Sequence, residues 1–183
     1  GAPDIGGISA GGDITITGSY VGAEGQTSGN VFISGGQILL QEFATIGVSA
    51  FEAGSNGGVL IRGDDVVLDG QSSIISGSTS PDEGPGIAIE AANSVLVLNG
   101  SALEATTFGD GDAGDIDIRA GGEITFAGAN PAGDAQTYID VSSFGAGRGG
   151  DIVLDAPIVQ LVDGANIYSI PRGTGDGGDI TIR

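Results

Sequence analysis

The chain has 183 residues, of which 24 are acidic and five are basic, so its formal net charge is −19. This charge argues against nucleic acid or an anionic membrane as a partner, because both need Lys or Arg to neutralise phosphates. Cysteine is absent, which excludes disulfides and thiol-based metal sites. No apolar run approaches the ~18 residues of a spanning helix, so we expect no direct membrane insertion.

The N-terminal segment 1–30 does not fit the pattern that follows it. Residues 12–16 fit the first strand of a repeat, and the next such strand begins with Val31, at a spacing of only 17 from Ile14 (31 − 14). This spacing is too short for three strands and three corners. We therefore predict an irregular or truncated N-terminal coil over residues 1–30.

From Val31 onward, a phrase of about 28 residues recurs, which is a period typical of solenoids. Apolar triplets begin at positions 31, 59, 87, 116, 152 and 180, and the differences between successive starts are 28, 28, 29, 36 and 28. Two further short β-branched stretches follow each triplet, as at 65–68 and 73–76. A hairpin fold gives no reason for the whole phrase to return. The sequence predicts a parallel β-helix over 31–183, with three strands and about 28 residues per coil.

Alternation within the triplets predicts which side chains are buried, because successive residues of a strand point to opposite faces. The inward columns are expected to contain Ile14 and Ile16, Val31 and Ile33, Val59 and Ile61, Ile87 and Ile89, Ile116 and Ile118, and Ile152 and Leu154. Residues 37–46 have partial helical spacing, but glycines bound them and their place in the period matches strands. We predict essentially no helix.

The longest period carries an insertion. Residues 127–136 add about eight residues (36 − 28) between the second and third strands of their coil. Insertions in solenoids become loops on one face, often the binding face. We expect either a tolerated decorative loop or a contact loop.

Three aspartates occupy the same place in successive coils, directly before the first strand: Asp115, Asp151 and Asp179. Stacked coils would bring their charges to roughly 5 Å, and calcium could relieve that repulsion. Their spacings, 36 (151 − 115) and 28 (179 − 151), do not match the tandem nonapeptide of calcium-binding β-rolls. The favoured interpretation is that each aspartate accepts hydrogen bonds from turn amides, with a calcium ladder as the alternative and no other cofactor.

Close acidic groupings that could support acid–base chemistry occur at 64–65, 82–83, 110–112 and 115–117. The first three lie in Gly- or Pro-rich corners, and the last faces outward. The chain has no histidine and no lysine to accompany them. We predict that the protein is not an enzyme.

Two features predict self-association. Phe32 and Leu60 are expected side by side on an outer face, where an exposed apolar cluster can mark lateral contact. Residues 178–183 begin a coil that nothing completes, so we expect a fragment of a longer protein. Unpaired strand edges near residues 14–16 and 178–183 would then pair end to end with another chain, and proline at Thr181 would block this.

Several glycine-rich phrases carry a resemblance to a known family. They are Gly109–Ile118, Gly147–Ile152 and Gly175–Ile182, with Leu98–Leu103 and Val162–Ile167 between them. Together they resemble the repeat region of filamentous-haemagglutinin-like exoproteins of the two-partner secretion pathway, particularly the cyanobacterial ones, over about residues 29–183.

This resemblance implies a right-handed coil and export through an outer-membrane transporter. It also implies a secreted or cell-surface location on a bacterium with an outer membrane. The expected function is a structural shaft or fibre-forming segment of a large surface protein, in adhesion or extracellular filament formation. The alternatives are a calcium-stabilised adhesin and a carbohydrate-binding module, although Tyr20, Tyr138 and Tyr168 are scattered along the sequence.

Overall fold

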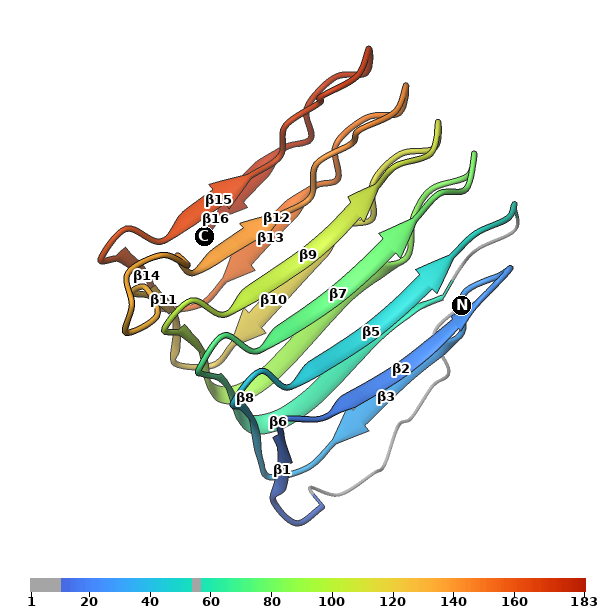
Figure 1. Ribbon diagram of the computed structural model, residues 1–183. Helices are drawn as coiled ribbons and strands as arrows, with labels where there is room; N and C mark the ends of the chain where they lie inside the picture. The colour runs from blue at the N-terminus through green and yellow to red at the C-terminus, as the bar shows by residue number, and fades with distance from the viewer. Residues whose placement is uncertain (1–10, 54–56) are drawn as a thin grey trace.

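The chain folds into a parallel β-solenoid of about 6 turns and about 28 residues per turn. A computed structural model describes residues 11–53 and 57–183, and these contain sixteen strands and no α-helix. The coils follow one another along a single axis from the N-terminal to the C-terminal end (Figure 1). The predicted β-helix and the predicted lack of helix are confirmed, and the hand of the coil stays a prediction.

Each coil has three strand positions, which together form two parallel sheets. The first position contains β3 (Asn30–Ser34), β10 (Ile116–Ala120), β13 (Ile152–Asp155) and β16 (Ile180–Ile182). The second contains β1 (Ile14–Thr17), β4 (Gln37–Gln41), β11 (Glu123–Ala127) and β14 (Ile158–Val162). The third contains β2 (Tyr20–Gly25), β5 (Thr45–Ala50), β7 (Ser73–Ser78), β9 (Ala102–Thr107), β12 (Tyr138–Asp140) and β15 (Asn166–Tyr168).

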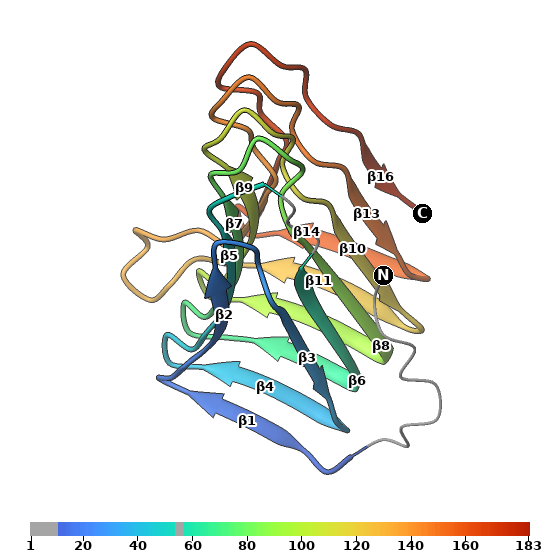
Figure 2. The ribbon, with the colours of Figure 1, turned by 90° about the vertical axis from the view of Figure 1, so that its right-hand side faces the viewer.

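The first and second positions belong to one ten-stranded sheet that bends around a corner. Two long strands, β6 (Gly58–Leu68) and β8 (Gly86–Leu98), run through both positions without a break. The third positions form a separate six-stranded sheet. Figure 2 shows the resulting wedge, in which the two sheets converge on a narrow edge formed by the turns from the third position to the first. We call this edge the apex.

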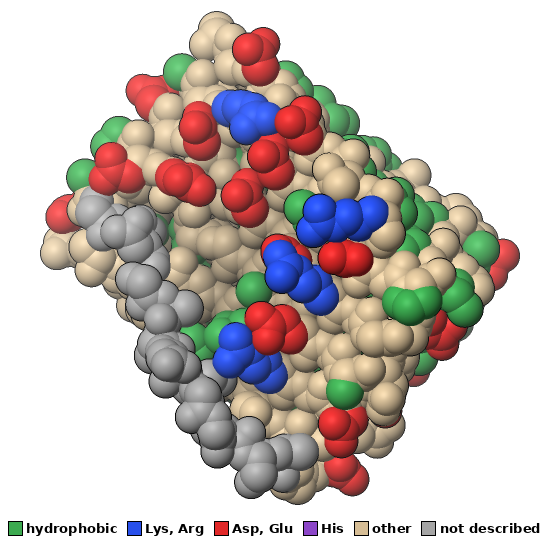
Figure 3. Space-filling view, turned by 180° about the vertical axis from the view of Figure 1, so that it is seen from behind, with side chains coloured by type: hydrophobic (Ala, Val, Ile, Leu, Met, Phe, Trp, Pro, Cys, Tyr) green, Lys and Arg blue, Asp and Glu red, His purple; other side chains and the backbone are tan. Residues whose placement is uncertain are grey.

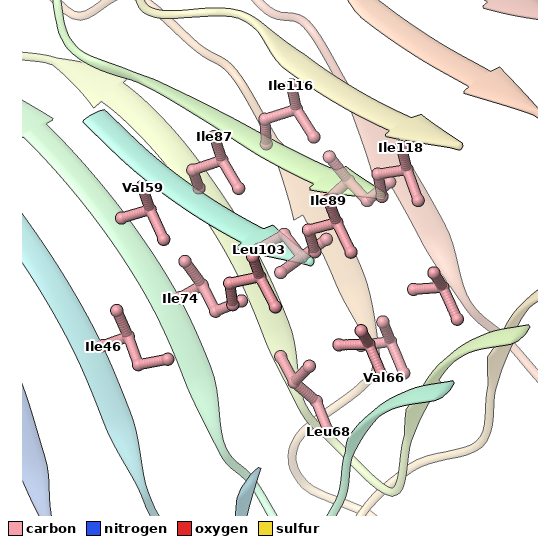
Figure 4. Close-up of a cluster of buried hydrophobic side chains, with 14 of the residues drawn as sticks. Ile46, Val59, Val66, Leu68, Ile74, Ile87, Ile89, Leu103, Ile116 and Ile118 are labelled. Atoms are coloured by element: carbon pink, nitrogen blue, oxygen red, sulfur yellow. The ribbon is translucent and has the colours of Figure 1, made fainter. Parts of the chain in front are cut away.

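Aliphatic side chains from both sheets fill the wedge as columns that run along its axis. Ile116 pairs in register with Ile87 on one side and Ile152 on the other, and all three are at most 2% exposed. Facing them, Ile46, Ile74 and Leu103 are fully buried in the opposite sheet (Figure 4). Burying each such side chain is worth about 1.5–3 kcal/mol. The predicted inward positions from Val59 to Leu154 are therefore confirmed.

The first described strand corrects the sequence interpretation. Ile14 pairs with Ile38, and Thr15 pairs with Leu39. Strand β1 thus occupies the second position of its coil, whereas we predicted the first. The short spacing to Val31 follows directly, because only the third strand β2 and its corners lie between them. Part of the predicted irregular segment, residues 1–10, lies outside the described residues.

Two further segments show how the corners are built. Residues 37–46 contain β4, a corner where Glu42 and Phe43 have φ values of 56° and 65°, and the start of β5. The insertion at 127–136 is closed by an antiparallel bridge between Ala129 and Gln136, and Asn130 bonds across it to Asp134 and Ala135. Figure 2 shows this loop projecting beyond the matching corners of the other coils.

Glycine at the apex permits the close stacking of successive turns. A Cβ atom added to Gly147 would lie 2.0 Å from the carbonyl oxygen of Gly111, and one added to Gly175 would lie 2.1 Å from that of Gly147. No side chain fits at such distances from backbone atoms. The glycine-rich phrases are therefore required by the contact between coils, in addition to any turn geometry.

The columns predict a sharp contrast between inward and outward substitutions in β10. Ile116→Asp places an unpaired charge in a fully buried site and should lower the free energy of unfolding by about 3 kcal/mol or more. The adjacent outward change Asp117→Asn should cost less than about 1 kcal/mol. Urea unfolding measures both, and equal shifts of the two midpoints would contradict the assignment of faces.

The apex contacts predict that Gly147→Ala destabilises the fold by about 1–3 kcal/mol, because the added methyl group forces neighbouring turns apart. Gly77→Ala is the matched control. Its added Cβ would approach Ser49 Oγ at 3.7 Å, an ordinary contact. Thermal unfolding of both variants tests the prediction, which is wrong if the two melting temperatures change alike.

Candidate interaction surfaces

The predicted aspartate column exists, and its carboxylates accept hydrogen bonds from the backbone. Asp115 Oδ1 accepts the N–H of Asp151 at 2.7 Å, and Asp151 Oδ1 accepts the N–H of Asp179 at 2.8 Å. Asp115 and Asp151 thus each bind the turn of the next coil. This geometry is the turn-amide arrangement that the sequence favoured over calcium.

An arginine supplies positive charge to the same column. Arg148 Nη2 lies 2.9 Å from Asp151 Oδ1 and 3.8 Å from Asp179 Oδ2, and its backbone N–H donates to Asp112 Oδ1 at 2.7 Å. Among residues 11–53 and 57–183, no group of three or more His, Cys, Asp or Glu side chains is placed to hold a metal ion. The guanidinium places positive charge next to two of the three aspartates, Asp151 and Asp179.

A second charged column was missed in the sequence. At the end of the first strand, successive coils carry Arg62, Glu90, Arg119, Asp155 and Arg183, whose signs alternate without exception. Figure 3 shows blue and red side chains following one another across this face. We call it the charge column.

One ion pair links the first two residues of the charge column, and another links its last two. Arg62 Nε lies 2.7 Å from Glu90 Oε2, and Arg183 Nε lies 3.2 Å from Asp155 Oδ2. Arg119 pairs within its own strand with Asp117 at 2.7 Å. The hydrogen bonds that Arg119 donates to Asp117 raise the pKa of Arg119, with smaller contributions from the charges of Asp155 and Glu90. The five residues follow the same spacing as the apolar triplets, and that spacing was the signal that could have revealed this column.

The predicted assembly residues Phe32 and Leu60 are neighbours on the outer face. They pair in register, and Ala88 follows in the next coil. Phe32 is 39% exposed and Leu60 is 9% exposed. A groove of about 370 Å³ runs over them, with Asp115 and Asp117 at its far end. Their adjacency is confirmed, and lateral contact through them stays a prediction.

Two tyrosines that are far apart in sequence lie on adjacent coils of the six-stranded sheet. The ring centroids of Tyr138 and Tyr168 are 6.5 Å apart, which corrects the view that the tyrosines are scattered. The Tyr138 hydroxyl donates to Glu104, and burial together with this bond raises its pKa. Tyr20 lies apart from them and donates to Glu24, which raises its pKa to about 12.

The apex carries a column of five residues, three of which are phenylalanines. Phe51, Thr79, Phe108, Phe144 and Arg172 each follow the third strand position of successive coils, and their N–H groups donate to the coil before. The rings of Phe108 and Phe144 stack at 4.7 Å with an interplanar angle of 13°, and the Arg172 guanidinium lies 5.2 Å from the Phe144 centroid. We call these five residues the apex column. The same coil spacing could have identified them.

Two of the predicted acidic groupings, 64–65 and 115–117, contain a carboxylate that binds neighbouring side chains. Asp65 accepts hydrogen bonds from Ser94 and Asn93 of the next coil, at 2.6 and 3.3 Å, and Asp117 pairs with Arg119.

No helix within the described part of the chain is long and apolar enough to cross a membrane.

Comparison with protein-family models, with curated proteins and with solved structures found no match to this chain.

The filled aspartate column predicts that calcium is not needed for folding, because amides and Arg148 already bind the carboxylates. Thermal unfolding in a calcium chelator should give the same melting temperature as unfolding in excess calcium, and magnesium serves as the ionic-strength control. A drop of several degrees on chelation alone would contradict this and favour the calcium alternative.

Proposed function

We propose that the protein is a structural shaft or fibre-forming segment of a large secreted or cell-surface protein. The observation that carries this proposal is the uniform coil-to-coil pairing, in which each strand position stacks in parallel on its counterpart. A solenoid of this kind makes an elongated body whose stability comes from neighbouring coils. The resemblance of the glycine-rich phrases adds the right hand of the coil, adhesion or filament formation, and export through an outer-membrane transporter.

The two ends of the described solenoid expose strands of the same three coil positions. One end presents strands β1, β2 and β3, which occupy the second, third and first positions. The other presents β14, β15 and β16, which occupy the same three positions. A second copy could therefore continue the coil in register, because an unpaired edge is a template for another strand.

The register of β16 determines which residue controls this pairing. Arg183 donates its N–H to Leu154, and Ile152 donates to Asp179, so odd-numbered backbone groups face β13. By alternation, the N–H of Thr181 faces β13 as well, whereas that of Ile182 points away from it. Proline at Thr181 would damage the existing coil, so the sequence-based choice is replaced by Ile182→Pro.

End-to-end association should grow as salt screens the −19 charge, because the screening length falls to about 8 Å at physiological ionic strength. We expect Ile182→Pro to abolish it by removing an outward donor. Ile182→Ala is the control, since it shortens the same side chain and keeps the N–H. Sedimentation velocity and electron microscopy give the readout.

Two results would contradict this proposal. A protein that stays monomeric across salt and concentration would not self-associate through its ends. Filaments that form equally well with Ile182→Pro would have to assemble through another surface.

A carbohydrate-binding module is a second candidate, favoured by the Tyr138–Tyr168 pair beside Glu104 and Asp140. Aromatic faces next to carboxylates are suited to sugar rings and their hydroxyl groups. Titration with neutral oligosaccharides, followed at the tyrosine ring resonances, separates this candidate from a purely structural shaft.

A further inference from the structure

Phenylalanine is usually buried in a folded protein, whereas the phenylalanines of the apex column are exposed. Of the six phenylalanines, Phe126 is fully buried, and the other five are at least 39% exposed. Three of these exposed rings, Phe51, Phe108 and Phe144, lie on the apex. Exposed apolar side chains gathered along one line can mark an interaction surface.

The ring of Phe108 has one covered face and one open face. Phe144 stacks on it from the following coil, nearly parallel, at 4.7 Å. The preceding coil offers only Thr79, whose hydroxyl donates to the carbonyl of Phe51 at 3.5 Å. Phe108 consequently remains 64% exposed.

Thr79 occupies the one coil that separates Phe51 from Phe108 in the apex column. Phe51 and Phe108 are two coils apart, and coils are spaced by about 4.8 Å, so their positions differ by roughly 9.6 Å along the axis. Thr79 lies midway, so a group placed over it would be one coil step, ~4.8 Å along the axis, from each of the two phenylalanine positions. The chain already fills the equivalent space beyond Phe144 with the guanidinium of Arg172, at 5.2 Å.

The three apex turns that follow Phe51, Thr79 and Phe108 are rich in acidic residues. These turns carry six carboxylates and no arginine of their own: Glu52, Asp82, Glu83, Asp110, Asp112 and Asp115. Arg148 of the following turn lies beside three of them, Glu83, Asp112 and Asp115, so it offsets the negative charge least at the other three. The next two apex turns, by contrast, include Arg148 and Arg172. A cation is therefore favoured over Thr79, and a like-charged copy of this face is not.

We propose that this part of the apex binds an arginine side chain from a basic segment of a partner protein. The guanidinium stacks over Thr79 between Phe108 and Phe51, while the surrounding carboxylates attract the positive segment. Guanidinium is planar and combines stacking with ion pairing, whereas the lysine ammonium is a compact, strongly hydrated charge. This site is independent of end-to-end association.

The test compares two peptides of equal length and charge, one rich in arginine and one rich in lysine, at 0.15 M salt. Isothermal titration calorimetry gives the affinities, and NMR shifts of the phenylalanine rings locate the contact. The arginine peptide should bind about threefold or more tightly than the lysine peptide. Phe108→Leu, which removes the aromatic face, should bring the two affinities together.

Two further variants separate this site from general charge attraction. Thr79→Phe fills the space with a ring of the protein's own, so it should abolish the arginine preference without destabilising the fold. Phe43→Leu changes an equally exposed phenylalanine at another corner and should leave the preference intact.

Three outcomes would overturn the proposal. Equal affinity for both peptides would mean that only charge is recognised. An arginine preference that survives both Phe108→Leu and Thr79→Phe would place the contact elsewhere. Binding of neutral oligosaccharides that depends on Phe108 would show that the apex recognises sugar rings instead of guanidinium.

Discussion

The parallel backbone pairing between coils is the interaction on which the rest of this structure depends. Because each strand pairs with its counterpart about 28 residues away, every side chain meets the residue at the same position in the coil above and below. Residues at the same coil position therefore stack on one another, and the molecule becomes a set of columns. Aliphatic columns fill the wedge, glycine columns close the apex, and charged or aromatic columns line the outside.

The same pairing places the few basic residues of the chain next to acidic residues of neighbouring coils, which helps to keep the coils in register. In the charge column, Glu90 lies between Arg62 and Arg119, so omission of any one of the three inner coils would bring like charges together. Each exposed ion pair is worth only about 0.2–1 kcal/mol, so the column adds little to stability. Its value lies in specificity, because the aliphatic triplets of different coils are nearly interchangeable and could stack out of order.

The sequence predicted the strand position of residues whose surrounding phrase repeats at the coil spacing. It failed where the position of a strand depends on which strand of the next coil it pairs with. Ile116 and Ile152 were assigned correctly because their triplets recur with the same flanking phrase. Ile14 was misassigned, since Asp13–Ile16 has the same four residues as Asp179–Ile182, and first and second strands both alternate apolar residues. Only its pairing with Ile38 in the next coil identifies its position.

Side chains outside the core were harder to predict for a related reason. Tyr138 and Tyr168, or Phe108 and Phe144, look isolated when each is compared with its neighbours in sequence, and they become partners once the coil spacing is applied. The interior columns are filled by aliphatic residues that differ little from coil to coil. Recognition by such a molecule must therefore come from outer columns, where one substitution per coil changes charge or aromatic character at a fixed spacing. The apex column is such a case, because Thr79 interrupts its planar groups at one coil and leaves the face of Phe108 open.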